Sequence, residues 1–489
     1  MALHLPIIDP PSGQTAERAA DASTAVRGRY SVVSLGCPKN TVDTEQMLGR
    51  LQHDGFALVA AGEPADLVVI NTCGFIESAR QESLAAIDEA LQQKRAGRVR
   101  GVIVAGCLAE RAREALLAER PEIDGLVGVF GRDEITGLAQ RILDGLGEQR
   151  SVFRPAPIRA LADNDRLAVT PKHFAYLKIS EGCDRLCTFC AIPKMRGKHA
   201  SKPLEQVVTE ARQLAESGVQ ELIVVAQDTT YYGLDLYGRP RLTELLRELD
   251  AIDGLRWIRL MYFYPMYIDQ PLIEVIGGAQ RILPYIDMPL QHASDRMLRR
   301  MSRRVDRSQT EQLIEQLRAG IPNLVLRTTF ITGFPGETEE DFRELRAFVK
   351  RQRFERLGVF TYSFEPDTPA ARLPDQLPEE IKHARRDELM AVQQKQAFAF
   401  NRRQLGRVVD VIIDRAVPGE SQAMVGRTMA DAPDIDGLTF VTPTDRTLTP
   451  GSIVRCEIVG MQDYDLIAVA LPDEAHPGRS EKQSSTRRR

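Results

Sequence analysis

The chain has 489 residues, of which 43% are hydrophobic and 27% are charged, so several globular domains are expected rather than one compact core. The formal net charge of −4 provides no overall basic field of the kind that attracts nucleic acids. No run of about 18 apolar residues occurs, which predicts no membrane span. Residues 1–27 also lack the apolar run of a secretory signal, and we interpret them as a disordered extension of a cytoplasmic protein.

Residues 28–144 alternate short apolar segments with segments of helical spacing. The apolar segments have the composition of buried parallel strands, and they are Val32–Leu35, Leu67–Ile70 and Val102–Ala105. The helical segments are Thr44–Asp54 and Glu77–Ala96. This alternation predicts a domain built on a parallel α/β sheet. Residues 145–168 contain scattered Pro, Arg and Asp without periodicity, and we interpret them as a linker.

Residues 169–402 repeat the alternation over a longer stretch. Six segments have strand character: Phe174–Ile179, Glu221–Ala226, Trp257–Met261, Tyr285–Met288, Val325–Thr329 and Gly358–Thr361. Helical segments such as Leu204–Ser217 and Glu339–Gln352 separate them. Six strand–helix units predict a partial (β/α)6 barrel, in which an active site lies at the carboxyl ends of the strands.

A third region follows the long polar segment Glu379–Gln404, which has helical composition. Residues 403–471 contain five short strand-like segments separated by Gly and Pro: Val408–Ile413, Ala423–Arg427, Thr439–Val441, Ile453–Ile458 and Leu466–Leu471. Short strands at even spacing predict a small antiparallel β-barrel. Residues 472–489 are polar and end in three arginines, which is typical of a disordered tail.

Six of the seven cysteines fall into two sets of three. An odd number of cysteines in a chain without a secretory signal argues against disulfides and favours metal binding or redox chemistry. One set follows the first barrel strand with the spacing C-x3-C-x2-C, and we call Cys183, Cys187 and Cys190 the loop cysteines. Three thiolates this close can bind three irons of a four-iron cluster, which leaves the fourth iron open to a small molecule.

The other three cysteines are far apart in the sequence, but each follows a predicted strand of the first region. We call Cys37, Cys73 and Cys107 the strand-end cysteines. Because the carboxyl ends of parallel strands meet at one edge of a sheet, these thiolates should converge in space. The sequence therefore predicts a second cluster, again with an open iron.

Simpler interpretations exist for both sets. A structural zinc site needs four ligands, and the nearest histidine, His199, is nine residues past Cys190. A lone cysteine at a strand end is commonly a small buried hydrophobe, which is how we interpret Cys456. The same coincidence at three strand ends favours a cluster for the strand-end cysteines.

The motifs around these cysteines resemble those of the methylthiotransferases. Leu35–Asn40 and Asn71–Ile76 are similar to the N-terminal domain of that family. Four stretches are similar to its radical S-adenosylmethionine core: Cys183–Cys190, Ile192–Pro193, Arg196–Lys198 and Phe330–Thr338. The C-terminal strands resemble its TRAM domain. Four further stretches resemble the RimO branch, which acts on a ribosomal protein, rather than the branch that acts on tRNA: Asp184–Pro193, Val225–Thr230, Asp235–Gly238 and Asp287–His292.

The resemblance implies two 4Fe-4S clusters, one on each set of cysteines, and S-adenosyl-L-methionine as cofactor. One cofactor molecule would methylate a sulfur at the strand-end cysteines, and a second would be cleaved at the loop cysteines to a 5′-deoxyadenosyl radical. The methylthio group would then go to the β-carbon of an aspartate in the twelfth small-subunit ribosomal protein, free or in the ribosome. An electron donor such as a flavodoxin or ferredoxin is implied, and no catalytic residue beyond the cluster ligands is expected.

Contacts to S-adenosylmethionine are expected where barrel strands end. The candidates are Phe189, Gln227, Asp228, Gln291, His292, Ser294, Thr332, Gly333 and Phe334. For each of them a tight turn or a structural side chain is an equally good interpretation. Tyr262, Phe263 and Tyr264 either shape a substrate channel or belong to the core.

Two other functions stay open from the sequence. A tRNA adenosine methylthiotransferase would use the same clusters, whereas a non-enzymatic iron–sulfur electron carrier would normally hold its cluster with four cysteines. Residues 403–471 contain six basic and ten acidic residues and no lysine, while RNA binding needs cations to neutralise phosphates. We therefore expect a basic ribosomal protein as partner, with no tRNA and no membrane.

Overall fold

The computed structural model describes residues 3–4, 26–60, 62–147, 150–160, 163, 166–420, 423–444 and 447–472. The predicted disordered ends, 1–27 and 472–489, lie almost entirely outside these residues. The chain divides into two compact units, Met1–Ala399 and Phe400–Arg489. Within the described part, no helix is both long and apolar enough to cross a membrane.

The N-terminal sheet of the first unit has the order β1-β2-β4-β5-β6-β7, with β3 also paired to β2. Its strands are β1 (Leu3–His4), β2 (Gly28–Gly36), β3 (Phe56–Leu58), β4 (Leu67–Thr72), β5 (Gly101–Gly106), β6 (Gly125–Val127) and β7 (Ser151–Val152). Every pair is parallel except β1 with β2. The predicted parallel α/β sheet is therefore confirmed, and the segment interpreted as a linker contributes β7.

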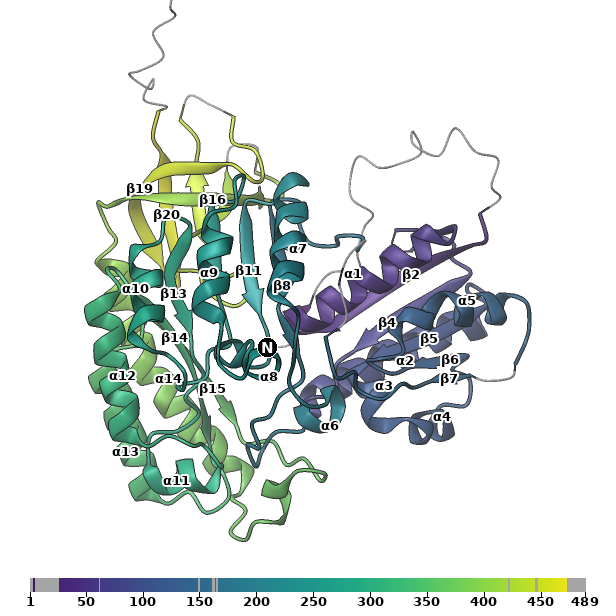
Figure 1. Cartoon of the computed structure of the whole chain (residues 1–489), viewed down its shortest axis with the longest axis horizontal. Coiled ribbons are helices and arrows are strands. Elements are labelled where there is room, and N and C mark those ends of the chain that lie inside the picture. Colours follow the sequence, from purple (N-terminus) through teal and green to yellow (C-terminus); the bar gives the residue numbers. More distant parts are fainter. Residues whose placement is uncertain are drawn as a thin grey trace, which may run out of the picture. The chain divides into compact units, whose positions relative to one another are not determined.

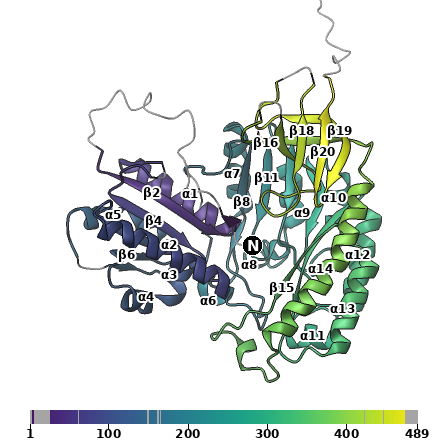
Figure 2. The ribbon, with the colours of Figure 1, turned by 180° about the vertical axis from the view of Figure 1, so that it is seen from behind.

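Helices cover both faces of this sheet (Figures 1 and 2). They are α1 (Pro38–His53), α2 (Glu77–Arg95), α3 (Cys107–Ala112), α4 (Glu114–Glu119), the 3-10 turn η1 (Arg132–Glu134) and α5 (Ile135–Leu143). The strands are apolar on both sides, so Leu67 and Val69 pack under α1 and α5, while Val68 and Ile70 pack under α2, α3 and α4. Burial on both faces explains why these strands read as continuous apolar runs.

The second sheet, which we call the barrel sheet, consists of six parallel strands in the order β15-β14-β13-β12-β11-β8. They are β8 (Phe174–Lys178), β11 (Glu221–Val225), β12 (Trp257–Leu260), β13 (Ile282–Asp287), β14 (Val325–Thr332) and β15 (Arg356–Thr361). The sheet is open between β8 and β15, as the predicted partial (β/α)6 barrel requires.

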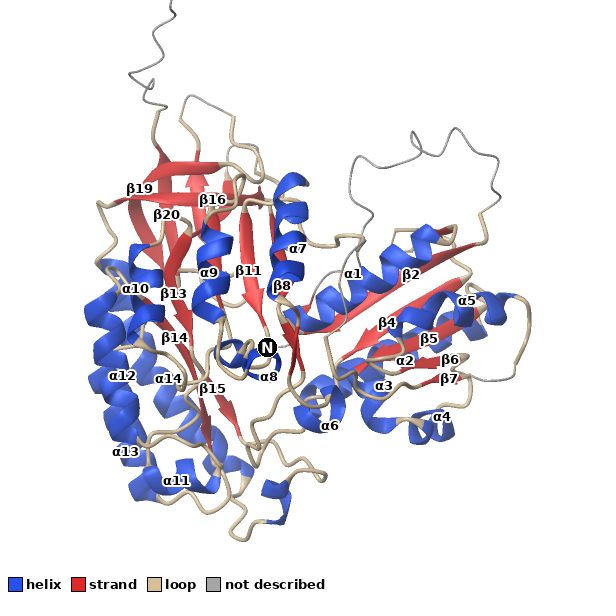
Figure 3. Ribbon diagram, viewed as in Figure 1, coloured by secondary structure: helices blue, strands red, loops and turns tan. Residues whose placement is uncertain are grey.

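Long helices lie along the outside of the barrel sheet (Figure 3). They are α7 (Leu204–Glu216), α9 (Leu242–Asp250), α10 (Gln270–Gly278), α12 (Arg307–Gly320), α13 (Glu339–Gln352) and α14 (Glu379–Arg402). Shorter elements lie in the connections: β9 (Ser180–Glu181), α6 (Ile192–Arg196), β10 (Ala200–Ser201), η2 (Thr229–Tyr231), α8 (Leu234–Tyr237), α11 (Asp295–Arg300) and η3 (Pro369–Arg372). The apolar core between strands and helices leaves the carboxyl ends of the strands for polar side chains.

The second unit contains a closed barrel in the order β16-β17-β18-β20-β19. Its strands are β16 (Val408–Ala416), β17 (Met424–Thr428), β18 (Thr439–Thr442), β19 (Ile453–Gln462) and β20 (Asp465–Ala470). The antiparallel prediction is wrong for one pair, because β18 and β20 run parallel. The chain reverses through β19 before β20 begins, so β20 returns in the direction of β18. Cys456 is fully buried in this barrel, as interpreted.

Candidate functional site

The strand-end cysteines occupy three neighbouring strand ends of the N-terminal sheet. Cys37 directly follows β2, Cys73 directly follows β4, and Cys107 directly follows β5. Because β4 lies between β2 and β5, the three residues converge at one edge, as predicted. A Cβ atom on Gly36, whose φ is +102°, would lie 3.0 Å from the Cβ of Cys73. Only glycine keeps the first two cysteines this close without strain.

Asn40 ties these strand ends together. Its Nδ2 donates to the carbonyl of Leu35 at 2.9 Å and to that of Thr72 at 2.8 Å, so one amide spans β2 and β4. Its Oδ1 lies 3.6 Å from the thiol of Cys107 after β5. The residue that forms the first turn of α1 therefore fixes all three ends.

The loop cysteines are held by backbone contacts and by two arginines. The Cys183 N–H donates to Gly197 O at 3.1 Å, and the Cys190 N–H donates to Cys187 O at 3.1 Å. The backbone N–H of Arg185 points to the Cys183 sulfur at 3.4 Å, and the Arg303 guanidinium lies 3.7 Å from the Cys187 sulfur. Donors aimed at sulfur are what a thiolate ligand of a cluster requires.

The chemistry of the six thiols fits iron–sulfur clusters. All are free of disulfides. Burial, reinforced by the neighbouring thiols, raises the pKa of Cys73 to about 12, and burial raises that of Cys183 to about 12. Burial alone would also raise the pKa of Cys37, but the charges of Lys39 and Arg196 outweigh it and lower that pKa. Crowded buried thiols ionise when a metal takes up their charge.

A single bound metal ion fits less well. Among the described residues, no three His, Cys, Asp or Glu side chains are grouped closely enough to hold one ion. In a four-iron cluster each cysteine binds a different iron, so the ligands stand apart. Both sets offer three thiols, which leaves one iron of each cluster without a cysteine.

Arg196, on α6, connects the two sets of cysteines. Its side chain is 1% exposed and donates to Glu181 Oε1 at 2.9 Å, next to the loop cysteines. The same guanidinium donates to Asn40 Oδ1 at 2.6 Å and to Asp43 Oδ2 at 2.8 Å in α1. The N-terminal sheet and the barrel sheet are thus joined through one buried cation.

More buried charges surround Arg196. Lys178 Nζ lies 2.6 Å from Asp43 and 3.1 Å from Glu181. Lys202 Nζ lies 2.7 Å from Asp163, which comes from the segment interpreted as a linker. A second group of charges joins the loop after β15 to α2 and α3, where Glu365 lies 2.6 Å from Arg80 and 2.9 Å from Arg111. Pairing is what permits so many charges to be buried.

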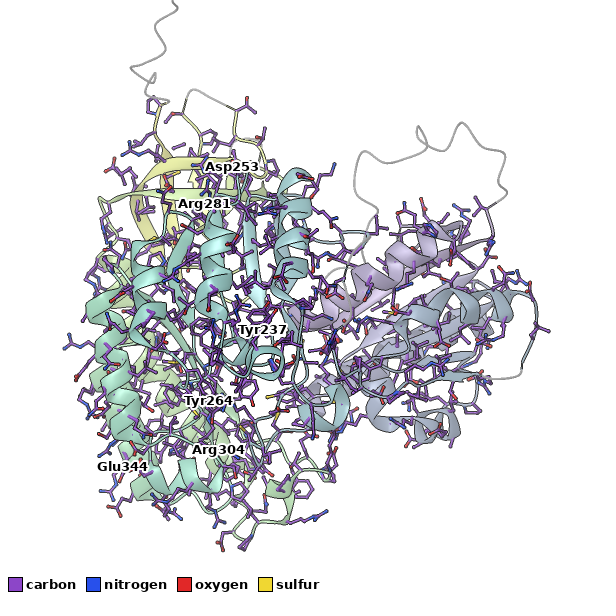
Figure 4. The ribbon with its side chains drawn as sticks, in the orientation of Figure 1. Tyr237, Asp253, Tyr264, Arg281, Arg304 and Glu344 are labelled. Carbon is purple, nitrogen blue, oxygen red and sulfur yellow. The ribbon has the colours of Figure 1, made fainter. Side chains whose placement is uncertain are left out.

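Aromatic rings and arginines line the carboxyl ends of the first barrel strands. The Arg185 guanidinium lies 4.1 Å from the ring centroid of Tyr264 and 2.6 Å from Asp228, and Arg303 lies 4.0 Å from the same ring. Tyr264 and Arg304 are at the end of the barrel opposite to Asp253 and Arg281 (Figure 4). Stacked arginines keep their charge in a partly dry environment.

Lys39 reaches from the N-terminal sheet to this end of the barrel. It is the second residue of α1, and its Nζ lies 3.3 Å from the ring centroid of Tyr262 just after β12. Tyr262 has a φ of +62°, an uncommon conformation for a tyrosine. Phe263, by contrast, belongs to the barrel core.

The predicted cofactor contacts lie at strand ends, but many of their side chains already have partners. Ser294 Oγ donates to Asp341 at 2.6 Å, and Thr332 Oγ1 donates to the Lys382 carbonyl at 3.2 Å. Asp228 caps η2 and pairs with Arg185. A Cβ on Gly333 would lie 2.2 Å from the Lys382 side chain, so this glycine serves helix packing. These contacts favour structural roles for the four residues.

The remaining predicted contacts to S-adenosylmethionine have side chains with fewer partners in the chain. Gln227 donates to Glu181 at 2.9 Å and has a buried Oε1 without a hydrogen-bond donor. Gln291 has a φ of +75° and bridges to Phe330. His292 lies 3.4 Å from Glu337, and Phe189 and Phe334 meet edge to face. Contact of these residues with S-adenosylmethionine stays a prediction.

Four functional side chains of this site have no role predicted from the sequence: Lys39, Arg185, Arg196 and Arg303. Three of them lay inside motifs that carried the family resemblance, so the signal was present for Lys39, Arg185 and Arg196. Arg303 follows α11 and had no pattern to mark it. Periodicity identifies elements, but it does not show which charged side chain is buried.

Three family models match the chain. Residues 29–128 match an uncharacterized family called UPF0004, residues 177–349 match the radical SAM superfamily, and residues 405–471 match the TRAM domain.

Similar curated proteins cover nearly the whole chain. The ribosomal protein uS12 methylthiotransferase RimO of Lachnoclostridium phytofermentans is 47% identical over 438 residues, which are 90% of this chain and 99% of the relative. The protein of the same name from Geobacter sulfurreducens is 45% identical and covers 90% of this chain and 98% of the relative.

Among solved structures, the radical S-adenosylmethionine methyltransferase TsrM of Kitasatospora setae matches with a TM-score of 0.51 at 16% identity. The match covers 67% of this chain and 72% of TsrM, and it supports the fold alone.

Proposed function

The chain belongs to the RimO family of ribosomal protein uS12 methylthiotransferases, and from this membership we propose that it methylthiolates an aspartate at its β-carbon in the twelfth small-subunit ribosomal protein. The observation that carries the proposal is the pair of three-cysteine sites within one unit, joined through Arg196. An electron carrier normally holds its cluster with four cysteines and does not need two sites that each leave one iron open.

We assign the loop cysteines and the strand-end cysteines as ligands of the two 4Fe-4S clusters. When bound, the clusters and S-adenosylmethionine supply the methylthio group and the radical chemistry that opens an unactivated C–H bond. The N-terminal domain, residues 28–144, would hold one cluster and the radical core, residues 169–402, the other.

The chain's own residues position these parts. Asn40 fixes the geometry of the strand-end thiols, and Arg196 transmits that geometry to Glu181 beside the loop cysteines. Arg303 places a positive charge beside the Cys187 sulfur. The aromatic side chains of Tyr262 and Tyr264 stack against Lys39 and Arg303 at the barrel end, where a radical has to be protected from water.

We further propose that a small electron-transfer protein, such as a flavodoxin or ferredoxin, reduces the loop site, since each cleavage of S-adenosylmethionine consumes one electron. A ribosomal protein substrate would place the enzyme in the cytoplasm. The acidic excess of residues 403–471 supports a basic protein partner over tRNA.

The test is an assay of the anaerobically reconstituted chain with S-adenosylmethionine, dithionite and the isolated ribosomal protein. We expect 5′-deoxyadenosine together with a methylthio group on one aspartate, read by mass spectrometry. Cys187→Ala should abolish both products, whereas Cys456→Ala, outside both sets, should retain them. Cleavage by the Cys187 variant would contradict the ligand assignment, and methylthiolated adenosine in tRNA would favour the sister enzyme.

A further inference from the structure

Lys39 is a buried cation whose ammonium group has no oxygen acceptor among the described residues. The residue is 7% exposed, and its Nζ lies over the Tyr262 ring. Throughout the described part of the chain, no carboxylate pairs with this ammonium and no oxygen accepts a hydrogen bond from it. Lys178 and Lys202 are at least as buried, and each has a carboxylate oxygen within 2.6 Å. Unpaired burial of a lysine is rare.

The anionic groups nearest to Lys39 are the Cys37 thiol, which we assign to a cluster, and the carboxylates of Asp287 and Glu181, which are engaged elsewhere. Asp287 accepts from Arg327 at 2.8 Å and from the Tyr262 backbone N–H at 3.1 Å. Glu181 accepts from Arg196 and Lys178. An aromatic face attracts the ammonium but takes the place of none of the acceptors that its three N–H groups need. The site is therefore built for an anionic oxygen that comes from outside the chain.

The position of Lys39 narrows the choice of anion. It stands two residues after Cys37 and touches Tyr262 at the barrel end, so it lies between the two sets of cysteines. A substrate carbon that gives up hydrogen at one site and receives sulfur from the other must also lie there. In an aspartate, the carboxylate is one bond from that β-carbon.

We propose that Lys39 binds the carboxylate of the target aspartate and thereby selects an acidic side chain for methylthiolation. This inference rests on the proposed function. A charge-assisted hydrogen bond to the carboxylate would also turn the β-carbon toward the reacting groups. The carboxylate of S-adenosylmethionine offers the same chemistry, and the experiment separates the two sources.

The experiment measures binding of the ribosomal protein to the reconstituted enzyme by fluorescence anisotropy, with aspartate or asparagine at the target position. We expect the wild type to prefer aspartate about 10- to 100-fold, as a charged hydrogen bond does. Lys39→Met keeps the aliphatic stem and removes the charge, and it should reduce this preference to near unity. Lys395→Met, an exposed lysine of α14, makes the same change of net charge and should leave the preference intact.

Several results would overturn the proposal. Equal binding of the aspartate and asparagine forms by the wild type would by itself overturn the proposal. Equal weakening of both forms by Lys39→Met, with iron content retained, would mean that Lys39 only packs the interface. A preserved preference combined with weaker binding of S-adenosylmethionine would assign the cofactor carboxylate instead. Failure of the proposed function appears separately, as absence of the methylthio product with the wild type.

Discussion

Replacing Arg196 by methionine would test whether buried charges hold the N-terminal sheet to the barrel sheet. The guanidinium is 1% exposed and lies 2.8 Å from Asp43 and 2.9 Å from Glu181, both nearly buried. Burial alone would raise the pKa of Glu181, but Arg196 and Lys178 hold it well below its usual range, so the carboxylate stays charged. Breaking a buried ion pair from one side costs about 3–5 kcal/mol, because the remaining charge has no partner.

The loss in free energy of unfolding should fall at the lower end of that range, because Lys178 still pairs with Asp43 and Glu181. Urea unfolding can be followed by the fluorescence of Trp257, the single tryptophan, in β12. With an m-value of about 3 kcal/mol per molar urea, the midpoint should fall by about 1 M.

Arg50→Met is the matched control, because Arg50 forms a half-exposed ion pair with Asp133 at 3.0 Å in the same part of the chain. Such surface pairs contribute about 0–1 kcal/mol. Equal midpoints for Arg196→Met and Arg50→Met would refute the reasoning. Arg196→Lys should restore little of the loss, since an ammonium group lacks the fork that reaches Asn40, Asp43 and Glu181 together.

The cofactor sites and the partner lead to further predictions. Changing all three strand-end cysteines to alanine should lower the iron content from about eight to about four atoms per chain. The variant should lose methylthio transfer but keep uncoupled 5′-deoxyadenosine formation. An unchanged iron content would mean that these cysteines are structural. Arg303→Met should shift the midpoint potential of the loop cluster to more negative values in a redox titration followed by electron paramagnetic resonance, whereas the exposed Arg304→Met should not. Binding to the isolated ribosomal protein should weaken with salt, and tRNA should show no measurable binding at about 0.15 M salt; tight tRNA binding would contradict the charge argument.

The sequence was sufficient for the elements and for the convergence of the strand-end cysteines. Strand β4 has a continuous apolar sequence because helices cover both of its faces. A cysteine that follows such a strand must lie at the carboxyl edge of the sheet. Helix α13 was predicted with its observed bounds, because Thr338 and Asp341 form a capping box at its start.

The charged network was beyond the reach of the sequence. Asp163 stands in a segment without periodicity, yet it is fully buried and pairs with Lys202. Nothing local marks Arg196 as buried either, because its partners Asp43 and Glu181 are distant in the chain or belong to another element. Tertiary packing decides which of many charged residues becomes enclosed. For the same reason, the sequence could not show that Ser294 and Thr332 already have partners.

Whether the second unit can bind tRNA depends on which of its charged residues reach the surface. Arg427 is buried and forms two hydrogen bonds to Asp414, at 2.8 and 2.9 Å, so it is not available to a phosphate. Asp431 is also buried and accepts from Thr428, so its charge reversal would damage the barrel rather than test a partner. Asp434 has a φ of +64°, which disfavours lysine, whereas Glu457 is exposed on β19, so Glu457→Lys is the cleaner probe. Within residues 403–471, the described arginines that remain exposed are Arg403, Arg407, Arg415 and Arg455. The exposed carboxylates of the same range are Asp410, Glu420, Asp434, Glu457 and Asp463. Since phosphate contacts supply most of the affinity for RNA, this surface favours a basic protein.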